Sequence, residues 1–333
     1  MKHSGYLTTS GAEIYYEQYG SGTPLLILHG NSQSLAVFYP FLRTFLPDFQ
    51  VILMDSRGHG RSRLSVHTAL HGFSTEDMAD DVIALLDHLH LSSVHLLGFS
   101  DGANIGLEIA CKYPERLKTL ICISANASPD GLLTPLHLAA QMQHSILNLL
   151  LPVLKCSFSS ASASSGSSAV SALSNLEASL PFQKKFSVSA TSAVCANKKR
   201  QHHFKSIFPR IPAEQRMCIP QSVFLCHRAK LPMAQKKKPD FLTRLTHRVL
   251  RRRNLTSLLL HSPRLSARKL QTISVPVLLI AGTRDLIKPS HSRWLARQIP
   301  TSRLLLMTGG RHTSIFRTPA PYLRAILEFL RRS

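Results

Sequence analysis

Residues 94–102, Val-His-Leu-Leu-Gly-Phe-Ser-Asp-Gly, decide the fold that this sequence predicts. A strand pattern at 94–97 leads into Ser100, which stands between Gly98 and Gly102, and a helical pattern follows at once. A sharp strand-to-helix turn forces its central residue into strained backbone angles and brings neighbouring segments close, so the flanking positions must be small. The sequence therefore predicts a turn that holds the Ser100 hydroxyl clear of a β-sheet.

Short apolar strands alternate with helical patterns on both sides of this turn. Strands are predicted at 13–19, 25–28, 50–54, 94–97, 120–123, 277–281 and 303–307, and helices at 34–45, 75–90, 101–113, 290–298 and 320–330. Ser74, three residues before Asp77, predicts a capping box at the start of the 75–90 helix. This alternation predicts an α/β fold with a mostly parallel sheet that is covered by helices on both faces.

The region between the two α/β segments has a different composition. An apolar helix is predicted at 136–154 and helical periodicity returns at 241–270, but ten of the eighteen residues at 157–174 are serine. Such a tract buries too little to offset its ordering entropy, so we expect disorder or a flexible linker. The predicted domains are a core at 1–130, a cap region at 131–271 with an insertion at about 156–238, and the rest of the core at 272–333. A lineage-specific insertion and a retained intron or frameshift both fit the composition of the insertion.

Basic residues are concentrated in one segment of the chain. The whole sequence has 40 Lys and Arg against 18 Asp and Glu, a formal charge of +22, and residues 183–253 alone hold 18 basic and 2 acidic residues. A local excess does not predict that the whole protein binds polyanions. The basic runs are compatible with a nuclear signal, but only scattered aromatic residues accompany them, so nucleic-acid binding is not expected.

Targeting and metal-binding signals are weak in this sequence. The first residues lack an apolar run of signal-peptide length, and polar residues interrupt the apolar stretch at 136–154, so we expect a cytoplasmic protein without a membrane span. The six cysteines form no C-x-x-C pair, which predicts free thiols. The cysteines and histidines between 195 and 227 fit no common zinc spacing, so no metal site is predicted.

Partners for Ser100 follow two strands near the end of the chain. A serine hydroxyl is a poor nucleophile at neutral pH and needs a base to take its proton and an acid to orient that base. Asp285 follows the 277–281 strand and His312 follows the 303–307 strand. The carboxyl ends of such strands collect functional side chains in α/β sheets. We therefore predict Ser100 as nucleophile, His312 as base and Asp285 as the orienting acid, with Asp130 as the rival acid. In the alternative interpretation, Ser100 is only a small residue in a tight turn and Asp285 only an acid at a helix N-terminus.

Backbone N–H groups near Ser100 are candidates for an oxyanion hole. The turn after the 25–28 strand can bring the N–H of Asn31 close to Ser100, and the N–H of Asp101 is the natural second donor. His29 in the same turn is interpreted as structural. Arg57, His59 and Arg61 follow the 50–54 strand, and we expect them to stabilise their own loop rather than to bind substrate.

Five motifs in one order give the chain a family resemblance. They are the His29-Gly30 turn, the Asp-Ser-Arg-Gly-His-Gly-Arg-Ser segment at 55–62, the turn at 98–102, the segment at 282–285 and His312. In this order they resemble the α/β-hydrolase-fold serine hydrolases, over a little more than half of the chain. The resemblance implies cleavage of a small carboxylic ester, thioester, lactone or amide through an acyl-enzyme on Ser100, with no metal or organic cofactor. It also implies that the cap region forms the substrate pocket.

Two further inferences concern the substrate and the alternative function. Ser100-Asp101 and the segment at 124–127 resemble the valacyclovir-hydrolase-like branch, in which the acid after the nucleophile reads a substrate amino group. Epoxide hydrolysis and dehalogenation by the related route need a carboxylate nucleophile, which Ser100 does not supply. The competing function is a non-catalytic scaffold whose basic insertion contacts an acidic partner.

Overall fold

The structure is a computed structural model that describes residues 2–163 and 241–332, with side chains at 2–152 and 244–332. The strands are β1 (Lys2–Thr9), β2 (Ala12–Tyr19), β3 (Thr23–Leu28), β4 (Phe49–Met54), β5 (Arg63–Leu64), β6 (Val94–Phe99), β7 (Leu117–Ile123), β8 (Val277–Gly282) and β9 (Ser302–Met307). The α-helices are α1 (Leu42–Phe45), α2 (Val66–His71), α3 (Thr75–His88), α4 (Asp101–Lys112), α5 (Thr134–Ala163), α8 (Phe241–His261), α9 (Ala267–Gln271), α10 (Pro289–Gln298), α11 (Ser314–Arg317) and α12 (Pro319–Arg332). Short 3₁₀ helices are η1 (Leu35–Phe41), η2 (Pro114–Arg116) and η3 (Pro129–Gly131).

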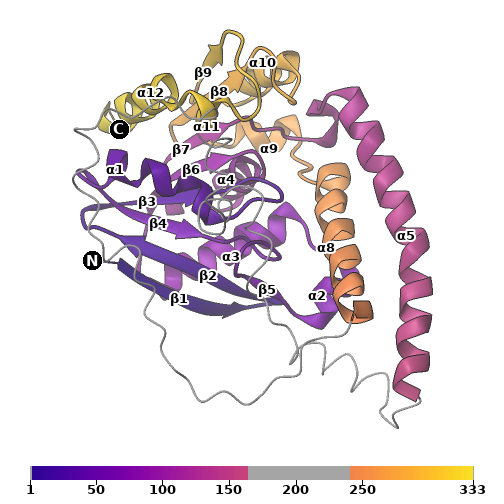
Figure 1. Cartoon of the computed structure of the whole chain (residues 1–333). Coiled ribbons are helices and arrows are strands. Elements are labelled where there is room, and N and C mark those ends of the chain that lie inside the picture. The colour runs from indigo at the N-terminus through magenta and orange to yellow at the C-terminus, as the bar shows by residue number, and fades with distance from the viewer. Residues whose placement is uncertain (1, 164–240, 333) are drawn as a thin grey trace, which may run out of the picture. The chain divides into compact units, whose positions relative to one another are not determined.

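The strands form one sheet in the order β1-β2-β4-β3-β6-β7-β8-β9, with β5 paired to β2 (Figure 1). The strand β2 pairs antiparallel with β1, β4 and β5. The other neighbours in the sheet, in the order β4-β3-β6-β7-β8-β9, pair in parallel. The central strands β6 and β8 are buried at every residue, as strands of a parallel sheet covered on both faces are. The predicted α/β fold with a mostly parallel sheet is therefore confirmed.

Helices cover both faces of the sheet and enclose two separate apolar cores. One core joins the sheet to α3, α4 and α10, and the other joins it to η1, α1 and α12. The predicted capping box is present at the start of α3, where the Ser74 hydroxyl accepts from the Asp77 N–H and the Asp77 carboxylate accepts from the Ser74 N–H. Apolar residues at helical spacing then bury one face of α3 in the first core.

Several elements differ from the sequence prediction. The strand β1 is not among the predicted strands. It lies at the sheet edge, pairs with β2 alone and has no fully buried residue, so its sequence lacks the apolar run of a buried strand. The predicted helix at 34–45 is a 3₁₀ helix followed by the short α1. Pro40 explains this difference, because proline has no N–H to donate within an α-helix.

The cap region lies between β7 and β8 in the sequence. Its helices α5 and α8 pack against each other. Leu147 and Leu151 of α5 share an apolar cluster with Val249 and Leu250 of α8. The helix α5 continues to Ala163, so the first residues of the predicted linker, 157–163, are helical in the structure. Extending an existing helix through alanine and serine avoids the cost of a new helical nucleus. The remainder of the serine-rich tract and the basic segment up to 240 lie outside the described residues.

Candidate active site

Ser100 lies at the turn between β6 and α4. Its backbone has φ 53° and ψ −117°, a conformation that residues other than glycine rarely adopt. A Cβ atom added at Gly98 would collide with the backbone of Gly102 and Ala103, and one added at Gly102 would collide with the backbone of Leu28. Both flanking positions therefore require glycine, as the sequence predicts for such a turn.

His312 joins Ser100 to Asp285. The His312 Nε2 atom lies 3.1 Å from the Ser100 hydroxyl oxygen, and its Nδ1 atom lies 2.6 Å from Oδ1 of Asp285. With Nδ1–H donating to the carboxylate, Nε2 is free to accept the serine proton. The structure thus brings the three predicted residues together in a hydroxyl–imidazole–carboxylate chain.

Contacts between two loops bring Asp285 and His312 together. Asp285 follows β8 and His312 follows β9, and these strands are parallel neighbours. The Thr283 N–H donates to the carbonyl of Met307 at 3.0 Å, and the Arg284 N–H donates to the carbonyl of Gly310 at 2.9 Å. Backbone hydrogen bonds between the loops therefore fix the two side chains relative to each other.

Ser124 is a further member of this network that the sequence reasoning did not assign. It follows β7 with φ 57°, and its hydroxyl donates to Oδ2 of Asp285 at 2.6 Å. The Ile287 N–H donates to the other carboxylate oxygen of Asp285 at 3.2 Å. A serine directly after a buried central strand is the sequence signal that could have identified it.

The charged form of Asp285 is stabilised although its side chain is buried. Burial acts to raise the pKa of this carboxyl, but the hydrogen bonds from His312 and Ser124 and the charge of His312 outweigh burial, so the pKa lies below its ordinary value. Asp285 is therefore a carboxylate at neutral pH and can orient the imidazole and stabilise its protonated form.

Asp130, the rival orienting acid, is not part of this network. Its side chain is exposed in the 3₁₀ helix η3, and its backbone carbonyl accepts a hydrogen bond from Lys288 Nζ at 2.9 Å. The carboxylate that accepts the hydrogen bond from His312 Nδ1 is that of Asp285 instead. The geometry thus favours Asp285 between the two acids.

The turn after β3 lies against Ser100. A Cβ atom added at Gly30 would lie 3.0 Å from the Cβ of Ser100, so this backbone passes directly beside the serine. The N–H of Asp101 belongs to the first turn of α4, where helical N–H groups have no partner within the helix. The N–H groups of Asn31 and Asp101 have no hydrogen-bond partner among the described residues, so both can donate to a bound oxygen.

The family model for the α/β hydrolase fold matches residues 23–319 of this chain. The chain belongs to the α/β-hydrolase fold family. The match runs from β3 to the start of α12 and includes Ser100, Asp285 and His312.

Individual relatives of this α/β-hydrolase are similar over shorter stretches. The chain is 33% identical over 128 residues to the protein named "Putative carbamate hydrolase RutD" of Azorhizobium caulinodans, which is 38% of this chain and 47% of that protein. It is 31% identical over 119 residues to the uncharacterized hydrolase YraK of Bacillus subtilis, which is 36% of this chain and 43% of that protein. The chain thus spans about half the length of the curated relatives it matches.

Solved structures agree with the fold over nearly the whole chain. A thermophilic esterase from Thermogutta terrifontis has a TM-score of 0.59 at 20% identity, covering 99% of this chain and 98% of that one. A hydrolase from Pseudomonas aeruginosa has a TM-score of 0.58 at 20% identity, covering 98% of both chains. At these identities the likeness concerns the fold alone.

The side chains of Asp101 and Asn31 contact each other beside the Ser100 turn. Asn31 Nδ2 donates to Oδ2 of Asp101 at 3.0 Å and to the backbone carbonyl of Leu255 in α8 at 3.1 Å. Burial raises the pKa of Asp101, while the Asn31 hydrogen bond and the charge of His312 act to lower it. These contacts tie the predicted oxyanion turn to the first turn of α4 and to the cap helix α8.

The segment at 55–62 forms a loop held by its own polar residues. Arg57 is buried and donates to both carboxylate oxygens of Asp81, at 2.6 and 2.8 Å. The Asp55 carboxylate accepts from the Leu35 N–H at 2.7 Å and from the Arg61 N–H at 2.8 Å. His59 is buried, and its Nδ1 lies 2.9 Å from the carbonyl of Arg57. These contacts favour the structural interpretation of the loop.

His29 is also buried, in the turn after β3. Its Nδ1 atom lies 2.8 Å from the carbonyl of Gly30, and its Nε2 accepts from the Ser56 N–H at 3.1 Å. Burial lowers the pKa of His29 to about 4, so the ring is neutral at neutral pH. Both ring nitrogens are occupied by backbone groups, which favours a structural role for this side chain.

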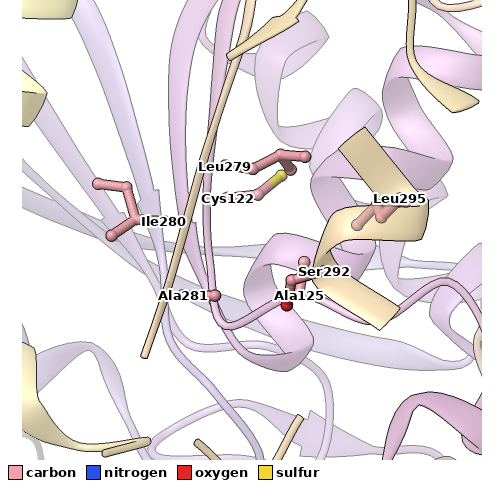
Figure 2. Close-up of a pocket in the computed structure, with 7 residues that line it drawn as sticks. All are labelled: Cys122, Ala125, Leu279, Ile280, Ala281, Ser292 and Leu295. Carbon is pink, nitrogen blue, oxygen red and sulfur yellow. The ribbon is translucent and has the colours of Figure 1, made fainter. Parts of the chain in front are cut away.

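Ser100 does not line the small internal cavity of the structure. Its volume is about 10 Å³, and it is lined by residues of β7, β8 and α10 together with Ala125, as Figure 2 shows. This is about the space that one water molecule needs. The hydroxyl of Ser292 lines it and has no hydrogen-bond partner among the described residues. The cavity is therefore suited to one buried water rather than to a substrate.

The described residues contain neither a candidate metal centre nor a candidate membrane-spanning helix. Cys111 and Cys122 are free thiols, and no group of three candidate metal ligands occurs in the described part of the chain. The cysteines and histidines between 195 and 227 lie outside the described residues. Within residues 2–163 and 241–332, no helix has the length and apolar character that a bilayer crossing requires.

Proposed function

We propose that this protein is a serine hydrolase that cleaves a small carboxylic ester, thioester, lactone or amide through an acyl-enzyme on Ser100. The observation that carries the proposal is the continuous chain from Ser100 through His312 to Asp285, with contacts of 3.1 and 2.6 Å. Membership of the α/β-hydrolase family supports the same chemistry. No step of this reaction calls for a metal or organic cofactor.

Acylation begins with the Ser100 hydroxyl. Its proton passes to His312 Nε2 while Oγ attacks the substrate carbonyl carbon, and the carbonyl π electrons move onto oxygen to give a tetrahedral oxyanion. The Asp285 carboxylate holds Nδ1–H and stabilises the imidazolium that forms. His312 then gives the proton to the leaving group as its bond to carbon breaks, which leaves the acyl group on Ser100.

Two backbone donors stabilise the oxyanion in this mechanism. The N–H groups of Asn31 and Asp101 flank Ser100 and are not engaged with other described residues. Preorganised donors of this kind typically contribute about 3–4 kcal/mol each to transition-state stabilisation. The Asn31 side chain, held by Asp101 and Leu255, keeps the first donor in place.

Deacylation repeats these steps with water. His312 takes a proton from water as the water oxygen attacks the acyl carbon, and the second tetrahedral intermediate collapses with return of that proton to Ser100 Oγ. The products are a carboxylic acid and regenerated enzyme. Asp285 keeps the same hydrogen bond to His312 throughout both halves of the reaction.

A fluorophosphonate probe tests this proposal directly. The wild-type protein should be labelled on Ser100, and Ser100→Ala should not be labelled. Ser92→Ala is the matched control, because Ser92 is an exposed serine in the loop before β6 and should leave labelling unchanged. Folded wild-type protein that resists labelling would contradict the proposal and would favour the scaffold function. Circular dichroism of each variant establishes that it is folded.

A further inference from the structure

The helix α8 places arginine side chains beside the predicted oxyanion turn. The backbone carbonyl of Leu255 in α8 accepts a hydrogen bond from Asn31 Nδ2 at 3.1 Å. Arg251, Arg248 and Arg244 precede Leu255 at spacings of four, three and four residues. These spacings put all four residues along one side of the helix. The side of α8 that meets the oxyanion turn therefore continues as a row of arginines.

Arg251 is the innermost arginine of this row. It is half-buried, and its Nε donates to the carbonyl of Gly58 at 3.2 Å. Its charge contributes to lowering the pKa of both His29 and His59, after the larger effect of burial, so it lies near the turn after β3 and near the 55–62 loop. Both histidines are neutral at neutral pH and do not compete with Arg251 for an anion.

The charge of Arg251 is not neutralised by the described protein. Burial lowers the pKa of its guanidinium, and among the described residues no carboxylate forms an ion pair with it. The contrast with Arg57 is direct, because Arg57 is buried against both oxygens of Asp81. A cation withdrawn from water is costly unless an anion accompanies it.

The two described helices of the cap region supply no acidic side chain to pair with Arg251. Neither α5 (Thr134–Ala163) nor α8 (Phe241–His261) contains an aspartate or a glutamate. Asp101 is a buried acid whose carboxylate accepts a hydrogen bond from Asn31 Nδ2. The side of α8 that meets the turn beside Ser100 therefore carries arginines and no acidic side chain.

We propose that Arg251 binds a carboxylate on the acyl part of the substrate, so that the preferred substrates are monoesters of dicarboxylic acids. This inference rests on the proposed hydrolase function, because it names the substrate class of the same site. The guanidinium can form paired hydrogen bonds with a carboxylate, which positions the far end of the acyl chain while the ester carbonyl lies at Ser100. Arg244, which is exposed, extends the positive field outward along α8 and attracts the anion.

A matched pair of esters tests the preference. The mono-4-nitrophenyl ester of glutaric acid carries the free carboxylate, and 4-nitrophenyl pentanoate is its neutral counterpart of similar length. The ratio of kcat/KM for the anionic over the neutral ester should be about tenfold or more in the wild type, as for a charge-assisted hydrogen bond. In Arg251→Gln this ratio should fall toward one, and in Arg251→Lys it should be intermediate. In Arg252→Gln, a change at the next and exposed position of the helix, the ratio should match the wild type.

Two outcomes overturn the inference. One is a wild-type enzyme that does not prefer the anionic ester, and the other is an Arg251→Gln variant that keeps the full preference. Binding of monomethyl glutarate to Ser100→Ala, measured by calorimetry, separates this inference from the proposed function. Binding that is lost in Ser100→Ala/Arg251→Gln but kept in Ser100→Ala/Arg252→Gln supports the anion site even if neither ester is hydrolysed. Hydrolysis of both esters with no such binding contradicts the anion site and leaves the hydrolase function standing.

Discussion

Replacing Asp285 by asparagine tests the part assigned to the acid. The substitution keeps the size of the side chain but removes the negative charge that lies 2.6 Å from His312 Nδ1, measured between the hydrogen-bonded atoms. The protonated imidazole forms only during the reaction, so losing its attraction to the carboxylate destabilises the transition state. For charges about 4 Å apart in a medium with an effective dielectric constant of about 20, this attraction is about 4 kcal/mol. A loss of that size lowers kcat/KM about 1,000-fold.

The assay is hydrolysis of an activated ester between about pH 5 and pH 9, or the rate of fluorophosphonate labelling. We expect both rates to fall in Asp285→Asn throughout this pH range, because the imidazolium that forms during the reaction loses its carboxylate partner. The matched control is Asp130→Asn, since Asp130 is exposed and does not contact His312. A fall of less than tenfold in Asp285→Asn, or a comparable fall in Asp130→Asn, would refute the assignment of the acid.

The remaining predictions concern the stability of the folded protein. Ser124→Ala should lower the free energy of unfolding by about 1–3 kcal/mol at neutral pH, because the buried Asp285 carboxylate loses a hydrogen-bond donor. An unchanged midpoint in a urea titration would contradict this. Arg57→Met should cost about 3–5 kcal/mol by leaving Asp81 buried without its partner, whereas Arg57→Met/Asp81→Asn should recover part of that loss in the same titration. The pKa of Asp285 is lower in the folded state, so its charge stabilises the fold above about pH 4 and that contribution is lost as the pH falls through the folded-state pKa. Acid titration should therefore show a steeper loss of stability in the wild type than in Asp285→Asn below about pH 4, and parallel curves would contradict this.

The sheet and the serine turn follow from local sequence signals. Buried parallel strands are short apolar runs, and a serine between two glycines at a strand-to-helix junction has few other structural explanations. These signals lie within a few residues of each other, so they can be read without knowing the tertiary structure. The strand β1 has no such signal. Its hydrogen bonds to β2 at the sheet edge hold it in place, and it contains no buried apolar run.

The choice between two acids and the roles of Ser124 and Arg251 depend on contacts between distant segments. Asp130 and Asp285 both follow strands of the sheet, and only the pairing of the loops after β8 and β9 shows which one meets His312. Ser124 and Asp285 are 161 residues apart in the sequence. Arg251 and Arg252 belong to the same basic run in the sequence. Only the packing of α8 against Asn31 shows that Arg251 is half-buried and Arg252 is exposed.

Capture of the acyl-enzyme is the most direct test of Ser100 as the nucleophile. The enzyme is mixed with 4-nitrophenyl acetate, quenched in acid within the first turnover, digested and analysed by mass spectrometry. We predict a burst of 4-nitrophenol and an acetyl group on Ser100, both absent in Ser100→Ala. Turnover in the wild type without an acyl group on Ser100, or with the acyl group on another residue, would contradict the proposed mechanism.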